Sequence, residues 1–174
     1  GQDHVFNLAQ GSTGFLNDNG GAKTTFIQRL PFLLACKPDL LVVGGMHNDG
    51  AYTSAQRVAA VVAYIAEVRK TRPTLPILIT GSLPLRGEAL ASWQSWDADI
   101  VTGIAQSTDA LTTFIPVSTD PSGPWFQAGG DAVTAGNVNT DRFFNSDLGA
   151  THLNQRSVYY HGRRVAEAIS AWAA

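Results

Sequence analysis

The chain has little charge, a single cysteine and no long apolar run. Asp, Glu, Lys and Arg make up 15% of its 174 residues, and the formal net charge is −2. A nucleic-acid-binding protein needs a clustered basic surface, so this composition argues against a nucleic-acid partner. No apolar run approaches the roughly 18 residues that indicate a membrane-spanning helix. The lone Cys36 excludes an internal disulfide and a cysteine-based metal cluster.

Strand-like apolar runs alternate with helical patterns along the whole chain. The strands are expected at residues 5–9, 40–44, 76–80 and 113–117. The helices are expected at residues 25–36, 54–70, 97–108 and 155–172, with Ser54 and Asp97 as helix caps. This alternation predicts right-handed crossovers and an α/β fold of three layers, with a doubly wound parallel sheet between helices. A single domain over residues 1–174 fits this length.

Polar loops follow the expected strands at residues 10–14, 45–50 and 81–87. Because ligands of such sheets bind beyond the carboxyl ends of the strands, these loops predict a binding edge. Gly11 offers a backbone N–H there and Asn48 a side-chain amide, while His152, just before the last helix, offers a base. Two donors and a base suit acyl transfer, because the oxyanion of its tetrahedral intermediate needs preorganised N–H groups.

Three stretches of sequence carry a family resemblance. They are Asn7-Leu8-Ala9-Gln10-Gly11-Ser12, Leu41-Val42-Val43-Gly44-Gly45-Met46-His47-Asn48-Asp49 and Asp147-Leu148-Gly149-Ala150-Thr151-His152. In this order they resemble the second, third and fifth blocks of the SGNH (GDSL-type) hydrolases, a family of esterases, lipases and carbohydrate deacetylases. The resemblance implies a flavodoxin-like fold and a carboxylic ester hydrolase that uses neither a metal nor another cofactor. It also implies that Gly11 and Asn48 form the oxyanion hole and that Asp147 orients His152 as the base.

Two spacings depart from the pattern of that family. Two residues rather than one separate Gly45 from Asn48, and four rather than two separate Asp147 from His152. Gly149 therefore stands at the position where the family carries its acid. Asp147 reaches the histidine only if the loop bulges, and Asp141 is an alternative partner.

The first block of the family, a strand that ends in a Gly-Asp-Ser turn with the nucleophile, is not found in the chain. The family places that strand between those expected here at residues 5–9 and 40–44. We therefore expect these two strands to lie roughly 9–10 Å apart, with unpaired backbone N–H and C=O groups facing each other. A companion polypeptide segment is predicted to supply the strand and the serine, because the chain would not fold alone with a buried unpaired ladder. Ser82, expected to be exposed after its strand, and Ser12 are weaker candidates for the nucleophile.

The leading hypothesis is a serine esterase that acts on a small acyl ester or an acetylated carbohydrate through an acyl-enzyme. The alternative is a non-catalytic binding module that keeps the fold without a nucleophile. A flavodoxin-like nucleotide binder fits less well, because no loop offers a phosphate cradle or a Walker lysine. Tryptophans expected in loops at the binding edge either line an acyl or sugar pocket or cover the core: Trp93, Trp96 and Trp125. Low charge and the resemblance favour a location outside the cytoplasm.

Overall fold

The fold is centred on a small parallel sheet. A computed structural model describes residues 5–83, 90–122, 125 and 155–173. Its three strands, β1 (Leu41–Gly44), β2 (Ile77–Thr80) and β3 (Thr112–Ile115), are parallel and lie in the order β1-β2-β3. The central strand β2 is buried at every position, as its uninterrupted apolar sequence predicts. The chain is therefore an α/β protein with a parallel sheet.

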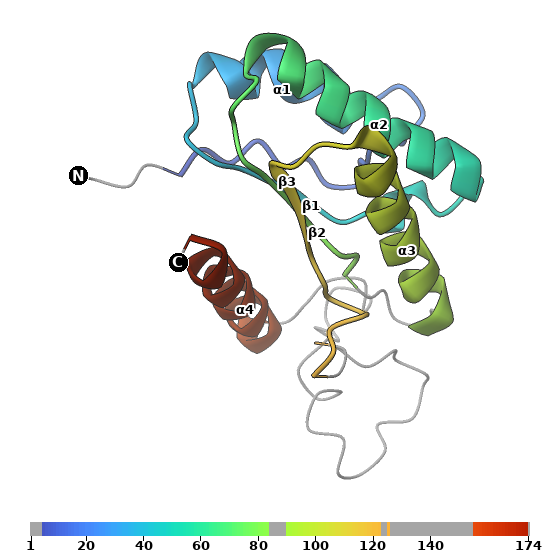
Figure 1. The fold of residues 1–174 in the computed structure, drawn as a ribbon. Coiled ribbons are helices and arrows are strands. Elements are labelled where there is room, and N and C mark those ends of the chain that lie inside the picture. The colour runs from blue at the N-terminus through green and yellow to red at the C-terminus, as the bar shows by residue number, and fades with distance from the viewer. Residues whose placement is uncertain (1–4, 84–89, 123–124, 126–154, 174) are drawn as a thin grey trace, which may run out of the picture.

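Helices cover both faces of this sheet (Figure 1). On one face lie α1 (Phe26–Ala35), α2 (Ser54–Thr71) and α3 (Leu90–Ser107), and on the other lies α4 (Gln155–Ala173). Because successive side chains of a strand point to opposite faces, Ile77 and Ile79 join the core beneath α1–α3, whereas Leu78 joins the smaller core beneath α4. None of the described helices has the length and hydropathy needed to cross a bilayer.

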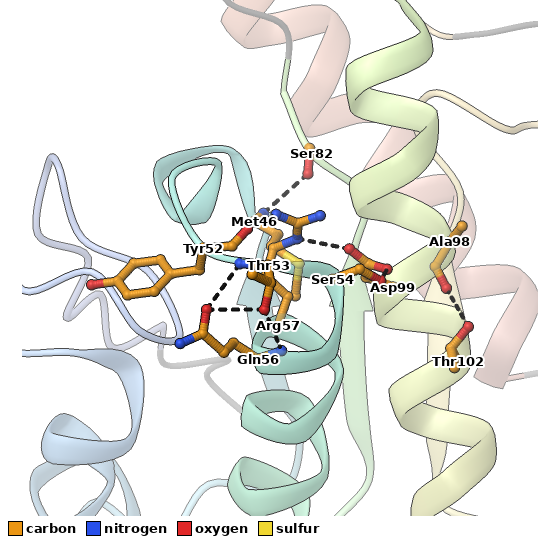
Figure 2. Close-up of polar contacts among 10 residues, drawn as sticks. All are labelled: Met46, Tyr52, Thr53, Ser54, Gln56, Arg57, Ser82, Ala98, Asp99 and Thr102. Atoms are coloured by element: carbon orange, nitrogen blue, oxygen red, sulfur yellow. Dashed lines mark hydrogen bonds and ion pairs between the residues drawn. The ribbon is translucent and has the colours of Figure 1, made fainter.

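Helix α2 is held in place at its N-terminal end, next to the loop that follows β1. Thr53, rather than the expected Ser54, is the cap: its N–H donates to Gln56 Oε1 at 2.9 Å, and its hydroxyl accepts from Gln56 N–H (Figure 2). A buried ion pair joins Arg57 Nε to Asp99 Oδ2 of α3 at 2.7 Å. The Arg57 guanidinium also donates to the carbonyl of residue 52. These contacts fix where the loop after β1 meets the helix layer.

The start of α3 differs from the expectation. Asp97 was expected to cap a helix, but the described part of α3 begins at Leu90, which places Trp93 and Trp96 inside the helix. Both tryptophans are buried in the core beneath α1–α3, so their assignment to a loop is wrong. Trp125 is also buried, in the core beneath α4. All three tryptophans thus cover the core, the second of the two roles considered for them.

The strand expected at residues 5–9 is also absent from the described sheet. Residues 5–10 have no regular secondary structure, and Val5 and Phe6 are 91% and 59% exposed. The apolar sequence alone does not make a strand, because a strand needs a neighbour to receive its N–H and C=O groups. Among the described residues, β1 is one of the two edge strands of the sheet, and residues 6–13 lie across a pocket from it.

Candidate functional site

A pocket of about 390 Å³ lies beside β1. One wall is formed by residues 6–13, and the other by β1 with the residues that follow it, His47 and Asn48. Side chains from α1 and α2 complete the lining: Phe26, Arg29, Leu33 and Tyr64. The pocket therefore contains two of the segments that the sequence singled out, the turn with Gly11 and the loop with Asn48.

Asn48 is positioned by a tight turn at the carboxyl end of β1. The chain passes through Gly45 with a φ of +43°, and a Cβ there would stand 3.3 Å from the backbone of Ser82, so glycine is required. A short 3-10 helix, η1 (His47–Asp49), follows. Asn48 Nδ2 donates to the Thr13 carbonyl at 2.9 Å. A primary amide has two N–H groups, and among the described residues the half-buried Asn48 has a hydrogen-bond partner for one of them.

Asp49, the neighbour of Asn48 in η1, holds the residues that follow the turn with Gly11. Its carboxylate is fully buried and accepts backbone N–H groups from Phe15 at 2.8 Å, Leu16 at 3.0 Å and Asn17 at 2.8 Å. The contact is so close that a Cβ on Gly14 would lie 2.4 Å from the carboxylate oxygens. The sequence analysis did not identify this role, since the partners of Asp49 lie more than thirty residues away along the chain.

Arg29 anchors the turn that carries Gly11. This buried side chain of α1 donates to Thr13 Oγ1 at 3.0 Å and to Gln10 Oε1 at 3.4 Å. Burial lowers the pKa of its guanidinium, and the neighbouring Tyr64 partly opposes that shift. The turn is thus held by Arg29 on one side and by the Asn48 amide on the other. The sequence gives no signal for this role, because Arg29 belongs to no recognisable motif and is a single polar residue within an apolar helix pattern.

Gly11 itself lies in an exposed turn. Its carbonyl accepts from Lys23 Nζ at 2.6 Å, and the residue lines the pocket that also holds Asn48. A Cβ added at Gly11 would meet nothing within 4 Å, so packing does not require glycine there. The next residue, Ser12, has a φ of +62° and an exposed side chain on the same pocket.

Ser82 does not have the exposure expected of a nucleophile. Its side chain is fully buried, and its Oγ accepts the Met46 N–H at 3.1 Å (Figure 2). Its own N–H donates to Asp97 Oδ1 at 2.7 Å. The expected exposure of Ser82 is wrong because the loops after β1 and β2 pack so closely that a Cβ on Gly45 would lie 3.3 Å from the Ser82 backbone.

Asp97 organises the carboxyl ends of β2 and β3. Besides the Ser82 N–H, it accepts the Ser118 N–H at 3.1 Å and the Ser118 hydroxyl at 2.6 Å. Burial raises the pKa of its carboxyl group even though these hydrogen bonds lower it. A Cβ on Gly81 would lie 2.5 Å from the carboxylate, so the glycine is needed for this approach. Asp97 is therefore a structural acid at the binding edge rather than a helix cap.

The expected base and its acid fall outside the described residues. This applies to His152 and Asp147, and also to the alternative acid Asp141. Of the described histidines, His47 lines the pocket beside Asn48. Across the described ranges, no three side chains of His, Cys, Asp or Glu gather as metal ligands.

The described site therefore consists of an open pocket with one amide donor and one turn of main chain on its walls. Two buried acids, Asp49 and Asp97, hold the loops around it. Comparison of the chain with protein-family models, with curated proteins and with solved structures finds no match. The interpretation of the site accordingly depends on its own residues.

Proposed function

We propose that this protein is a serine esterase of the SGNH (GDSL) type, acting on a short acyl ester or on an O-acetyl group of a carbohydrate. The observation that carries the proposal is the placement of Asn48 and of the turn with Gly11 on one pocket. The two are also linked, since Asn48 donates to the Thr13 carbonyl at 2.9 Å. An amide side chain and a main-chain turn on one pocket can supply the N–H donors that an acyl-transfer site needs.

In the proposed reaction, a serine hydroxyl supplied by a companion polypeptide segment attacks the ester carbonyl. His152, oriented by Asp147, takes the hydroxyl proton and returns it to the leaving alcohol. The Gly11 N–H and the second N–H of the Asn48 amide stabilise the oxyanion. Water then attacks the acyl-enzyme, with the same histidine as base, and releases the carboxylic acid and the serine.

The oxyanion assignment is tested by Asn48→Ala in the intact protein with every polypeptide that copurifies with it. Loss of one oxyanion donor typically costs about 100- to 1000-fold in kcat. We expect that loss for p-nitrophenyl acetate, with KM little changed. The matched control is Asn17→Ala, because the Asn17 amide donates to the Ser12 carbonyl at 3.0 Å but does not line the pocket. Full activity of Asn48→Ala, or an equal loss in the control, would overturn the assignment.

The base and the nucleophile are tested separately. His152→Ala should reduce hydrolysis to background. A fluorophosphonate probe should label a serine on the companion segment, and Ser12→Ala should leave this labelling unchanged. Loss of the labelling in Ser12→Ala would instead identify Ser12 of this chain as the nucleophile.

A non-catalytic binding module on the same fold is the second candidate. It is favoured by the burial of Ser82, which removes one internal candidate for the nucleophile. Under this alternative the complete assembly takes up no fluorophosphonate, and Asn48→Ala changes only the affinity for a ligand. Absence of labelling with all copurifying chains present would favour this alternative over the esterase.

A further inference from the structure

Arg29 is a buried cation that lines the pocket. It is 7% exposed, and it takes part in none of the ion pairs of the described structure. Among the described residues that line the pocket, none is acidic. Buried charges in proteins are normally paired, because removing an ion from water is costly. The pocket is therefore lined by a positive charge that no carboxylate of the described residues balances.

Other groups around the pocket do not neutralise Arg29. Burial raises the pKa of the Tyr64 phenol, which therefore stays protonated and neutral near pH 7. The buried Asp49 carboxylate accepts backbone N–H groups of residues 15–17 instead. Lys23 adds a second positive charge at the same turn, since its Nζ donates to the Gly11 carbonyl at 2.6 Å. The surroundings of this turn thus favour an anionic ligand.

The protein uses only one of the three nitrogens of the Arg29 guanidinium. Nη1 donates to Thr13 Oγ1 at 3.0 Å, to Gln10 Oε1 at 3.4 Å and to the Thr24 carbonyl. Nε and Nη2 donate to none of the described residues, and neither is among their buried polar atoms without a partner, so both remain accessible. Nε and Nη2 form the edge of a guanidinium that can bind both oxygens of a carboxylate. Anchoring of the turn through Nη1 leaves this edge for a ligand.

Arg29 also lies close to Asn48, the candidate oxyanion donor. Arg29 holds the Thr13 hydroxyl, and Asn48 donates to the carbonyl of the same residue at 2.9 Å. Phe26 covers one face of the guanidinium, with its ring centroid 5.0 Å from Arg29 Cζ, and lines the pocket as well. An apolar neighbour lowers the local dielectric constant and strengthens a charge-assisted hydrogen bond. One small ligand in this pocket of about 390 Å³ can therefore contact both Arg29 and Asn48.

We propose that the pocket recognises an ester that carries a carboxylate, and that the Nε–Nη2 edge of Arg29 binds this carboxylate through two parallel hydrogen bonds. The inference rests on the proposed function and narrows its substrate class to short esters whose acyl or alcohol part bears a carboxylic acid. A neutral ester would leave the buried charge of Arg29 unbalanced. One guanidinium balances one carboxylate, whereas a phosphate group carries roughly two charges.

Binding is tested by NMR titration of the intact protein with every polypeptide that copurifies with it. Sodium butyrate is the probe, and butyramide is the control because it has nearly the same shape without the charge. We expect butyrate to bind roughly 10- to 100-fold more tightly at constant ionic strength, because the bidentate contact is charge-assisted. The Arg29 Nε–H resonance, assigned by its loss in Arg29→Lys, should shift with butyrate. The Arg72 resonance is the reference, because Arg72 donates to the Pro38 carbonyl and does not line the pocket.

Two substitutions separate the planar edge of Arg29 from its charge. Arg29→Lys keeps the positive charge without the edge, so the preference for butyrate over butyramide should fall roughly tenfold. Arg72→Gln removes a positive charge outside the pocket and should leave the preference unchanged. If Arg29→Lys does not fold, the comparison of butyrate with butyramide in the unsubstituted protein still decides the matter.

Turnover is tested with mono-4-nitrophenyl adipate and its neutral methyl ester, which differ in the charge at the far end of the acyl chain. We expect kcat/KM to be about tenfold higher for the anionic ester, and this ratio to be lost in Arg29→Lys but kept in Arg72→Gln. The ratio cancels any general loss of activity that a merely structural role of Arg29 would cause.

Three results would overturn the inference: equal affinity for butyrate and butyramide, an unshifted Arg29 resonance at saturation, or tighter binding of inorganic phosphate than of butyrate. The two proposals fail separately because binding does not depend on turnover. A protein that binds butyrate at Arg29 but hydrolyses neither adipate ester supports the carboxylate site and contradicts the esterase proposal. A protein that hydrolyses both esters equally well contradicts the present inference alone.

Discussion

Replacing Asp49 should loosen the contact between η1, which carries Asn48, and residues 15–17, which follow the turn with Gly11. The buried carboxylate accepts N–H groups from Phe15, Leu16 and Asn17, and it lies next to Asn48 in η1. Oδ1 receives the N–H groups of Leu16 and Asn17, and Oδ2 receives that of Phe15. Because each oxygen has its own partners, the losses of stability in Asp49→Ala and Asp49→Asn can be ranked.

The magnitude follows from the number of hydrogen bonds that each substitution removes. A hydrogen bond to a charged acceptor contributes about 1.5–3 kcal/mol, and such contributions are not additive. Asp49→Ala removes all three, one of them from the buried Phe15, so we expect the free energy of unfolding to fall by about 3–5 kcal/mol. Asp49→Asn keeps one carbonyl oxygen for Leu16 and Asn17 but turns an NH₂ group towards the Phe15 N–H. We expect a loss of about 1–3 kcal/mol for this variant.

The assay is urea denaturation followed by tryptophan fluorescence, with the esterase activity of the intact assembly measured in parallel. Asp39→Asn is the control, because Asp39 is exposed and its replacement should change stability by less than about 0.5 kcal/mol. In folded Asp49→Asn, kcat should fall while KM changes little, since the turn and the Asn48 amide lose their fixed relation. Equal stability of Asp49→Ala and Asp39→Asn would refute the conclusion that the Asp49 carboxylate holds residues 15–17 in place.

Two further predictions concern packing and pH. Gly103→Ala should lower the free energy of unfolding by about 1–3 kcal/mol in thermal unfolding, because its Cβ would lie 2.6 Å from the Val61 Cβ. Gly162→Ala in α4, where a Cβ would meet nothing within 4 Å, should raise it by up to about 1 kcal/mol. Equal effects of the two substitutions would contradict the close contact of α2 and α3. Burial raises the pKa of Asp97 in the folded state. As pH rises, the unfolded chain therefore loses the Asp97 proton at about pH 4, before the folded chain does. The free energy of unfolding should fall between that pH and the raised pKa of the folded state. Asp97→Asn should flatten that decline in urea titrations across the pH range, and an unaltered decline would assign it to other groups.

The sequence predicted those parts of the fold that depend on the pattern of a single segment. The apolar runs predicted both β1 and β2. A strand covered on both faces has no room for polar side chains, which holds for β2, whereas β1 alternates between buried and exposed residues. The apolar stripe of α2 also agrees with the structure, in which Val58, Val61 and Val68 are buried. The same reasoning placed Asn48 at the carboxyl end of β1, beside the pocket.

What the sequence alone could not determine depends on groups that are distant along the chain. Residues 5–9 have a strand-like pattern but no partner strand in the described structure, and pairing is a property of two segments. The buried roles of Asp49, Ser82 and Asp97 depend on backbone N–H groups brought to them by other loops. Sequence periodicity encodes which face of one element is apolar, whereas the hydrogen-bond partner of a buried polar atom is decided only when separate elements pack together.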